Sequence, residues 1–315
     1  MSALNSVKKF EKHHAAFLVF MLIAGVFLIN IFAFTAAYNG IEERQFTNSS
    51  PLIIVQAPTP ETENDKTEEA KPAFFSGLEE RMKTILDGEE VESAVYLKDL
   101  STGETLGINQ TTTFVSASLY KIFASYEVAR QIDLGQIEPT DQTGYDAGST
   151  SIEDCLFRTL SYSDNPCGRA LRKVIEADDA PLSAINDAGF VGTSLVNDYP
   201  TTSASDVGLF FERLYESREF ADSVNNMLLE PLLAQEVNDR LPVPLPEDTK
   251  IAHKTANLDG YSHDGGIFYT PGGNYVLVVL TGPWPNGYTD SPSLHISLSS
   301  LVYDWFNPTA ATTSF

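Results

Sequence analysis

The order in which strand-like and helix-like segments follow one another leaves few folds open to this chain. Alternating apolar and polar residues predict two strands, at 91–100 and 105–108. Three further strands are predicted much later, at 250–255, 266–269 and 275–281, and helical periodicity fills the interval. This order suits an antiparallel five-stranded sheet built from both ends of a domain, together with an all-helical lobe.

The predicted helices have apolar residues three and four positions apart. They lie at 74–86, 118–132, 152–160, 167–176, 182–188, 205–215, 220–233 and 294–306. We therefore expect a folded domain of the α/β (α+β) class at 74–308, followed by a short tail at 309–315. A cleft between its sheet and its helices is the default place for a site.

An uncharged apolar segment precedes this domain. Residues 15–37 carry no charged side chain and are long enough, as a helix, to span a hydrocarbon core of about 30 Å. Three lysines lie in residues 1–14 and no basic cluster follows the segment, which predicts a cytoplasmic amino end and a folded domain outside the cytoplasm. A cleavable signal peptide is the alternative, because 35–37 resembles a small-residue cleavage site, but the length of the segment favours an uncleaved transmembrane helix.

Composition limits what the chain can be and what it can bind. Residues 38–73 are rich in Pro, Glu and Thr, so we expect a disordered, self-repelling spacer between the membrane and the domain. A hydrophobic content of 43% supports a packed core and excludes wholesale disorder. The net charge of −23 repels phosphate backbones, so no nucleic-acid partner is expected. We predict a single-pass protein of the cell membrane with a monomeric ectodomain.

Two cysteines, Cys155 and Cys167, flank a predicted loop between two helices. Exported domains can form disulfides, so we expect a bridge that fastens this loop, the alternative being two buried small apolar side chains. No metal site is expected, because His253, His263 and His295 show no ligand spacing with either cysteine. No cofactor is expected, because nothing resembles a phosphate-binding glycine loop.

The first candidate motif opens the helix predicted at 118–132. Ser118 and Lys121 are three residues apart, which places the hydroxyl and the amine on one helical face. The N–H groups at a helix start favour developing negative charge, and a buried lysine can lose its proton and act as a general base for the hydroxyl. Taken alone, the pattern also describes a helix-capping serine with an exposed lysine.

Two further motifs follow along the chain. Ser163-Asp164-Asn165 lies on the loop between two predicted helices, where these residues are also ordinary helix-capping chemistry. Lys254-Thr255 lies at the end of the first late strand, where the plainer interpretation is an edge-strand lysine beside a β-branched neighbour. Each motif is weak by itself, but the three in this order are not.

The ordered set Ser-x-x-Lys, Ser-Asp-Asn and Lys-Thr-small is the signature of active-serine penicillin-recognising enzymes. The chain strongly resembles this superfamily over 74–306, and most closely the class A beta-lactamase-like catalytic domains. The likeness extends to 254–280, which is similar to the family's stretch from its Lys-Thr-Gly motif through its last two strands. The resemblance implies acyl-serine chemistry on an amide or lactam bond.

The resemblance also implies a role for each matched residue. These are Ser118 as the acylated nucleophile, Lys121 as its base, Ser163 as the proton relay to the leaving nitrogen, Asn165 as the partner of the substrate side-chain amide, Lys254 as a positive charge and Thr255 as a hydrogen-bond partner of the substrate carboxylate. The backbone N–H groups of Ser118 and Asn257 would form the oxyanion hole. Asp164 is expected to be structural.

Two departures from the family pattern bear on function. Ala256 stands where the family has glycine, which we expect to tune the approach of substrate. Thr201-Thr202 with Asp206 resembles the family's Thr-Thr motif, yet the preceding loop lacks the Glu that activates the deacylating water. Asp198 is the only carboxylate between 189 and 201, and a turn residue is its simpler interpretation. We therefore expect acylation with slow deacylation.

Three functions remain open. The first is a membrane-anchored serine hydrolase that opens beta-lactams. The second is a penicillin-binding D,D-carboxypeptidase or peptidoglycan amidase that acts on D-Ala-D-Ala-type peptides. The third is a wall-binding or beta-lactam-sensing module with little turnover, for which an intact nucleophile set has no evident use. We rank them in that order.

Overall fold

The computed structural model describes residues 74–145, 148–176, 181–196, 199–285, 287 and 291–308. They belong to one compact unit, which spans 70–315. The predicted transmembrane segment at 15–37, the spacer at 38–73 and the tail at 309–315 lie outside the described residues. In the part that is described, every helix is too short or too polar to cross a bilayer.

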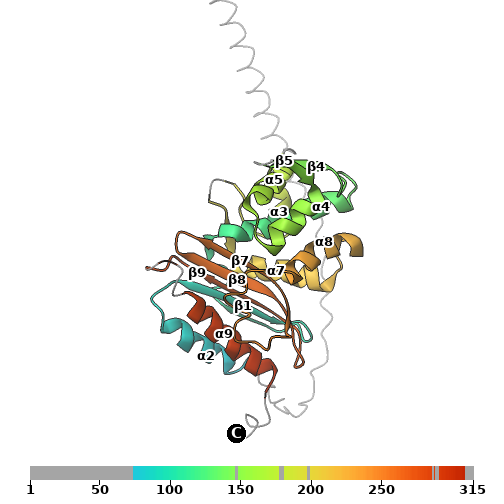
Figure 1. The fold of residues 1–315 in the computed structure, drawn as a ribbon. Coiled ribbons are helices and arrows are strands. Elements are labelled where there is room, and N and C mark those ends of the chain that lie inside the picture. Colours follow the sequence, from blue (N-terminus) through green and yellow to red (C-terminus); the bar gives the residue numbers. More distant parts are fainter. Residues whose placement is uncertain are drawn as a thin grey trace, which may run out of the picture. The chain divides into compact units, whose positions relative to one another are not determined.

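A five-stranded antiparallel sheet forms the centre of the domain, and its strands come from both ends of the domain, as predicted (Figure 1). The strand order is β2-β1-β9-β8-β7, so β7 and β2 are the edge strands. The strands are β1 (Ser93–Asp99), β2 (Thr105–Ile108), β7 (Lys250–Leu258), β8 (Tyr261–Tyr269) and β9 (Tyr275–Thr281). In the register, Leu97 of β1 lies opposite both Leu106 and Leu277.

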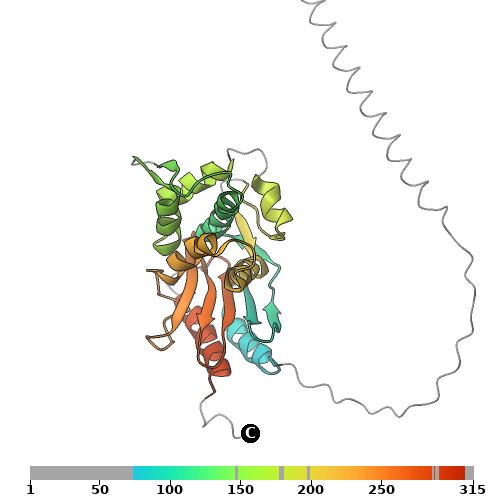
Figure 2. The same ribbon diagram turned by 90° about the vertical axis from the view of Figure 1, so that its right-hand side faces the viewer.

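Helices cover both faces of this sheet. They are α2 (Leu78–Asp87), α3 (Tyr120–Asp133), α4 (Ile152–Ser161), α5 (Asn165–Glu176), α6 (Pro181–Asp187), α7 (Ala204–Glu216), α8 (Asp222–Leu233) and α9 (Ser291–Phe306), with a 3₁₀ turn, η1 (Ala117–Leu119), ahead of α3. The first and last of them, α2 and α9, pack together on one face, and α7 packs on the other, where α3, α4, α5 and α8 form the helical lobe (Figures 1 and 2).

Strand periodicity divides the core into two layers. Ala94 and Tyr96 of β1 face the helical lobe, whereas Val95 and Leu97 face α2 and α9. Because successive strand side chains point to opposite faces, one strand supplies both layers. The central strand β9 is buried throughout and apolar up to Thr281, since both of its faces are covered.

The structure differs from the prediction where strands are short or polar. β8 begins at Tyr261 rather than at 266, because its first half buries polar side chains that hydrophobic periodicity does not register. Two small antiparallel pairs were not predicted. They are β3 (Thr113–Val115) with β6 (Thr201–Ser203), and β4 (Gln142–Tyr145) with β5 (Gly148–Ser151). Each strand of these pairs is too short to show a period.

Candidate active site

Ser118 lies in the 3₁₀ turn η1, and the regular helix α3 begins only at Tyr120. The turn is held by Ser116, whose N–H donates to Pro200 O at 2.7 Å, and its backbone enters the left-handed region at Ala117, with φ 46°. Such a conformation in a non-glycine residue costs on the order of 1–3 kcal/mol and persists only where the surroundings impose it. The turn packs beside β7, which brings half-buried Ser118 next to the edge strand.

Lys121, the second residue of α3, is wholly buried. Its Nζ donates to Ser163 O at 2.6 Å, to Ser163 Oγ at 3.1 Å and to Asn165 Oδ1 at 2.7 Å. Three acceptors match the three hydrogens of an ammonium group. The structure thus joins the first two motifs through Lys121, whereas the Ser118 hydroxyl makes no hydrogen bond to a described residue.

Burial also changes the acidity of Lys121. Removal from water disfavours the charged form, so the pKa of Lys121 falls to about 8, although the charge of Asp164 opposes this change. A lysine with this pKa is roughly one-tenth neutral at pH 7, far more than an ordinary lysine. The same side chain can therefore rest as an ammonium group and act as a base.

The Ser163–Asn165 loop is held in a strained conformation. Ser163 has φ 62°, in the left-handed region. Asp164 Oδ1 accepts the Cys167 N–H at 2.7 Å, and Oδ2 accepts from Arg158 Nη2 at 3.0 Å. Burial opposes ionisation, but these two donors outweigh it and hold the pKa of Asp164 below its usual value. Asp164 thus points to Arg158 and the start of α5, as a structural role requires.

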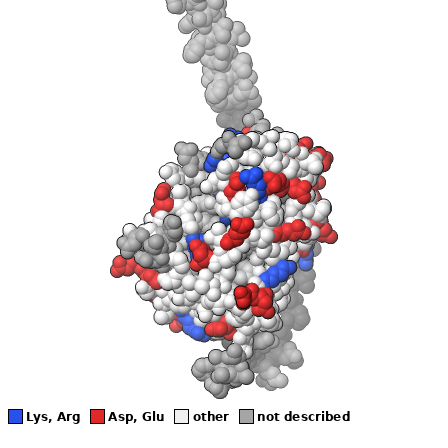
Figure 3. All heavy atoms as spheres, viewed as in Figure 1, with Lys and Arg blue, Asp and Glu red and all other residues white. Residues whose placement is uncertain are grey.

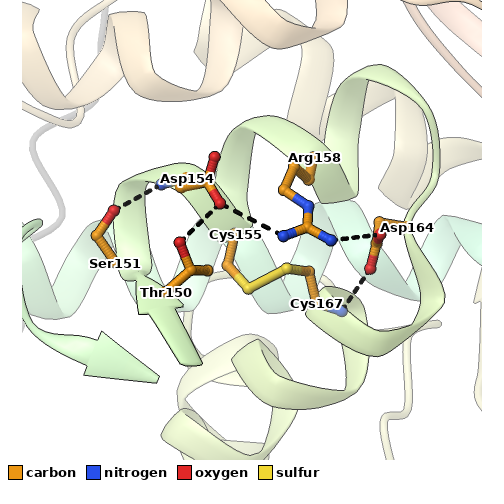
Figure 4. The surroundings of a disulfide bond; sticks show 7 residues. All are labelled: Thr150, Ser151, Asp154, Cys155, Arg158, Asp164 and Cys167. Atoms are coloured by element: carbon orange, nitrogen blue, oxygen red, sulfur yellow. Dashed lines mark hydrogen bonds and ion pairs between the residues drawn. A yellow bond between two sulfur atoms is a disulfide. The ribbon is translucent and has the colours of Figure 1, made fainter. Parts of the chain in front are cut away.

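A disulfide fastens the two helices that flank this loop (Figure 4). Cys155 of α4 and Cys167 of α5 are bonded, with their Cα atoms 5.0 Å apart. Arg158 of α4 bridges Asp164 and, at 3.5 Å, Asp154. The disulfide and the Arg158–Asp164 pair tie α4 to the start of α5 on either side of Ser163, whereas the Arg158–Asp154 pair lies within α4.

Lys254 and Thr255 lie on β7, and both are buried. Lys254 Nζ donates to Thr255 O at 2.8 Å. Burial and, to a smaller extent, the charge of Lys121 lower the pKa of Lys254 to about 7, against the opposing charge of Asp264. The two lysines of the sequence motifs therefore interact through their charges. The Ala256 methyl packs in the core facing the helical lobe, where it fills space.

Arg240, which no sequence pattern singled out, is a third buried cation and acts on Lys254. It is wholly buried in the loop before β7, and its Nη2 donates to Asn257 Oδ1 at 2.6 Å. Its Nε and Nη1 make no hydrogen bond to a described residue, although Nη1 lies 3.4 Å from Asp239 Oδ1. The charge of Arg240 also lowers the pKa of Lys254. A lone arginine in a polar loop carries no local signal of burial.

A buried His–Asp pair joins the loop of Arg240 to β7. His253 Nδ1 lies 2.9 Å from Asp264 Oδ1, and its Nε2 lies 2.8 Å from Asn238 Oδ1. Asp264 Oδ2 accepts the N–H of Leu241 at 3.2 Å. Burial opposes ionisation of Asp264, but the neighbouring His253 outweighs it and lowers the pKa of this carboxyl. These contacts fix Arg240 relative to Lys254.

The remaining candidate groups either have structural partners or lie outside the described residues. Asp206 accepts from Thr193 Oγ1 at 2.7 Å, and Thr193 is hydrogen-bonded to Thr202, so the Thr-Thr motif belongs to a buried polar cluster. Asp198 lies outside the described residues. In the segments that are described, no group of three or more His, Cys, Asp or Glu side chains is arranged to hold a metal ion.

The fold, with its motif residues where the sheet meets the helical lobe, is that of a beta-lactamase-like serine hydrolase. A model of the beta-lactamase enzyme family matches residues 77–306, and the chain belongs to this family.

Individual relatives are distant. A beta-lactamase of Kitasatospora aureofaciens is 24% identical over 262 residues, covering 72% of this chain and 84% of that protein. One of Streptomyces albus G is 23% identical over 242 residues, covering 65% and 77%. Among solved structures, a beta lactamase from Xanthomonas campestris has TM-score 0.67 and 18% identity, covering 75% of this chain and 99% of its own. The structure of PBP-A has TM-score 0.67 and 18% identity, and the match covers 74% of this chain and 97% of PBP-A.

Proposed function

We propose that this chain is a membrane-anchored extracytoplasmic serine hydrolase that opens beta-lactams through an acyl-enzyme and releases the product slowly. The observation that carries the proposal is the position of Lys121. Its amine lies within hydrogen-bond distance of Ser163 and Asn165, three residues after Ser118, in a site where burial brings its pKa to about 8.

In the acylation step, Ser118 Oγ attacks the lactam carbonyl while neutral Lys121 accepts the hydroxyl proton. The lactam C–N bond breaks, and Ser163, hydrogen-bonded to Lys121 at 3.1 Å, passes a proton to the leaving nitrogen. In the free protein the Lys121 amine faces Ser163 and Asn165, so it must release at least one of these bonds to reach the Ser118 proton. Backbone N–H groups of Ser118 and Asn257 are the proposed oxyanion hole.

Cations beside β7 suit an anionic substrate. We assign Lys254, Thr255 and Arg240 to the substrate carboxylate, because the two cations are buried and Arg240 has two nitrogens without a hydrogen bond to any described residue. Charge-assisted, paired hydrogen bonds from a guanidinium are the strong form of carboxylate recognition. Asn165, exposed at the start of α5, is assigned to the substrate side-chain amide.

We expect slow deacylation because the described residues offer no evident general base for the water. Within the described residues, no carboxylate hydrogen-bonds to Ser118, Lys121 or Ser163, and Asp164 is committed to Arg158 and Cys167. A general base typically contributes about 10²–10⁴-fold to the rate of the step that it serves. Hydrolysis of the acyl-enzyme is therefore the step that we expect to limit turnover.

The anchor is proposed from residues 15–37 and the acidic spacer that follows them. Fractionation of producing cells and protease treatment of intact cells test it. The full chain should remain with the membrane and lose its ectodomain to external protease. A shortened, freely soluble protein would instead indicate a cleaved signal peptide.

A penicillin-binding D,D-carboxypeptidase or peptidoglycan amidase is the second candidate. It is favoured by the same missing base, and by the fold of PBP-A, which matches the domain with the same TM-score as the beta-lactamase. In this case the lactam would inhibit the protein by forming a stable adduct.

Time-resolved intact-mass spectrometry of the full-length protein with excess benzylpenicillin separates these functions, with Ser118→Ala as the control. We expect an adduct at Ser118 that decays slowly while hydrolysed drug accumulates. A persistent adduct would favour the D,D-peptidase or a sensor. A native protein that never gains mass would refute acylation of Ser118 by this drug and favour a binding module.

A further inference from the structure

We propose that Gly168 of α5 is a positioning residue for Lys121, because its missing side chain leaves the space through which Lys121 reaches Ser163 and Asn165. The inference rests on the proposed function in one respect, the role of Lys121 as the base. It adds a requirement in the neighbouring helix that none of the sequence motifs contains.

The backbone does not require glycine at this position. Gly168 is buried in α5, its N–H bonds to Asp164 O at 3.0 Å, and its φ is not in the left-handed region. Glycine in a helix interior is less favourable than alanine because it loses more conformational freedom on folding. Local helix stability therefore argues against Gly168, and the reason for it must lie in packing.

The packing is close on the side of α3. A Cβ atom at Gly168 would lie 2.9 Å from Lys121 Cε and 3.3 Å from Lys121 Cδ, and 3.0 Å from the Tyr120 hydroxyl. Non-bonded carbon atoms attract best at about 3.5–4.0 Å, so the first of these contacts is repulsive. The stem of Lys121 thus occupies the volume that a methyl group would need.

The Lys121 side chain cannot move away from position 168 without losing its hydrogen bonds. The side chain is wholly buried, and its amine is held by two acceptors on Ser163 and one on Asn165. A methyl group at 168 would therefore displace the amine from these acceptors rather than turn it into solvent. Misplacing a catalytic group by about 1 Å can cost about 100-fold in rate.

The substitution Gly168→Ala in the full-length protein tests the inference, because acylation should fall far more than stability. We expect little change in melting temperature, since the preference of the helix for alanine and the cost of the close contact with Lys121 oppose each other. We expect the second-order rate constant of acylation by benzylpenicillin to fall about 10- to 100-fold, and its dependence on pH to shift with the proton affinity of the displaced amine. The matched control is Gly144→Ala, where an added Cβ meets no atom within 4 Å, and it should leave acylation unchanged.

A second variant separates the two neighbours of Gly168. If the methyl group acts through the Tyr120 hydroxyl alone, Tyr120→Phe in the Gly168→Ala background restores acylation, and the inference about Lys121 is wrong. If it acts through Lys121, acylation stays slow. A folded Gly168→Ala protein that acylates at the native rate with an unchanged pH profile overturns the inference directly.

Two further experiments keep the inference testable if the Gly168→Ala protein does not fold or if the proposed function is wrong. If Gly168→Ala does not fold, adding Lys121→Ala should restore folding, and continued failure would show that the collision lies elsewhere. If the native protein is not acylated, the proposed function fails, but the inference is still tested by titrating ¹³C-labelled lysines by NMR. The Lys121 resonance should then titrate differently in the native and Gly168→Ala proteins, and an identical titration would refute the inference.

Discussion

Individual residues of the proposed site differ in how clearly the sequence reveals them. Lys121 and Asn165 belong to motifs whose order could be recognised, and the structure places them 2.7 Å apart through Nζ and Oδ1. Arg240 could not be recognised, because its significance depends on burial beside Asn257, which is distant in sequence. Local patterns report periodicity, whereas a buried charge is defined by contacts between distant segments.

The first prediction at this scale concerns the pH dependence of acylation. Lys121 must be neutral to accept a proton, and its pKa is about 8, so the active fraction grows as pH rises through that value. Lys254 must be charged to attract the substrate carboxylate, and its pKa is about 7, so this fraction falls as pH rises. The second-order rate constant of acylation should therefore pass through a maximum between about pH 7 and 8.

A Lys254→Arg protein is the control for the alkaline side, because arginine stays charged throughout this range. Its acylation should keep rising above the native maximum. An alkaline fall that persists in this variant would show that Lys254 does not limit the rate there.

The second prediction concerns Arg240. Replacing it with alanine should weaken the binding of carboxylate-bearing lactams about 10- to 100-fold, because charge-assisted hydrogen bonds are worth about 1.5–3 kcal/mol. The charge of Arg240 also lowers the pKa of Lys254, so its removal should move the alkaline side of the profile to higher pH. Pre-steady-state acylation kinetics measures both effects. Equal loss in Arg240→Lys, which keeps a charge, would point to a packing defect instead.

At the scale of elements, the sequence predicted those whose period is simple. β2 and β9 have the predicted boundaries, because their apolar residues alternate or fill a strand covered on both sides. The helix predicted from Ser118 begins at Tyr120, since the left-handed residue Ala117 and the bond from Ser116 to Pro200 impose a 3₁₀ turn first. Tertiary contacts therefore impose this turn, and the turn places Ser118 beside β7.

The third prediction concerns the tie between α4 and α5. Replacing Cys155 and Cys167 with alanine should lower the free energy of unfolding by about 3 kcal/mol, the chain-entropy value for a loop of this length. Acylation should also slow at temperatures where the variant is fully folded, because the disulfide holds the loop that presents Ser163 to Lys121. Urea unfolding and stopped-flow acylation give the two values. If the variant loses stability but acylates at the native rate, the disulfide stabilises the fold without positioning Ser163.

The molecule as a whole is defined by its charge. Asp and Glu number 43 against 20 Lys and Arg, and acidic side chains predominate on the face shown in Figure 3. Three of the cations, Lys121, Lys254 and Arg240, are buried, and so are several acids, so the exterior keeps the acidic excess that the composition indicates. This segregation places positive charge where we assign the substrate carboxylate. It also leaves a surface that repels itself.

The last prediction follows from this repulsion. Adding sodium chloride shortens the Debye length from about 30 Å at 0.01 M to about 3 Å at 1 M, which screens repulsion between exposed carboxylates. Salt also weakens surface ion pairs such as Lys83–Glu79, but exposed pairs contribute only about 0–1 kcal/mol each. With acids in twofold excess, relief of repulsion should outweigh that loss. The melting temperature should therefore rise with salt, by about 2–4 °C for each kcal/mol gained.

Calorimetry over a salt series near neutral pH measures this effect. The control is the same series near pH 4.4, the isoelectric point, where the net charge is close to zero and the rise should shrink. A melting temperature that is flat or falls with salt near neutral pH would mean that attractive pairs, not repulsion, dominate the surface energy of this domain.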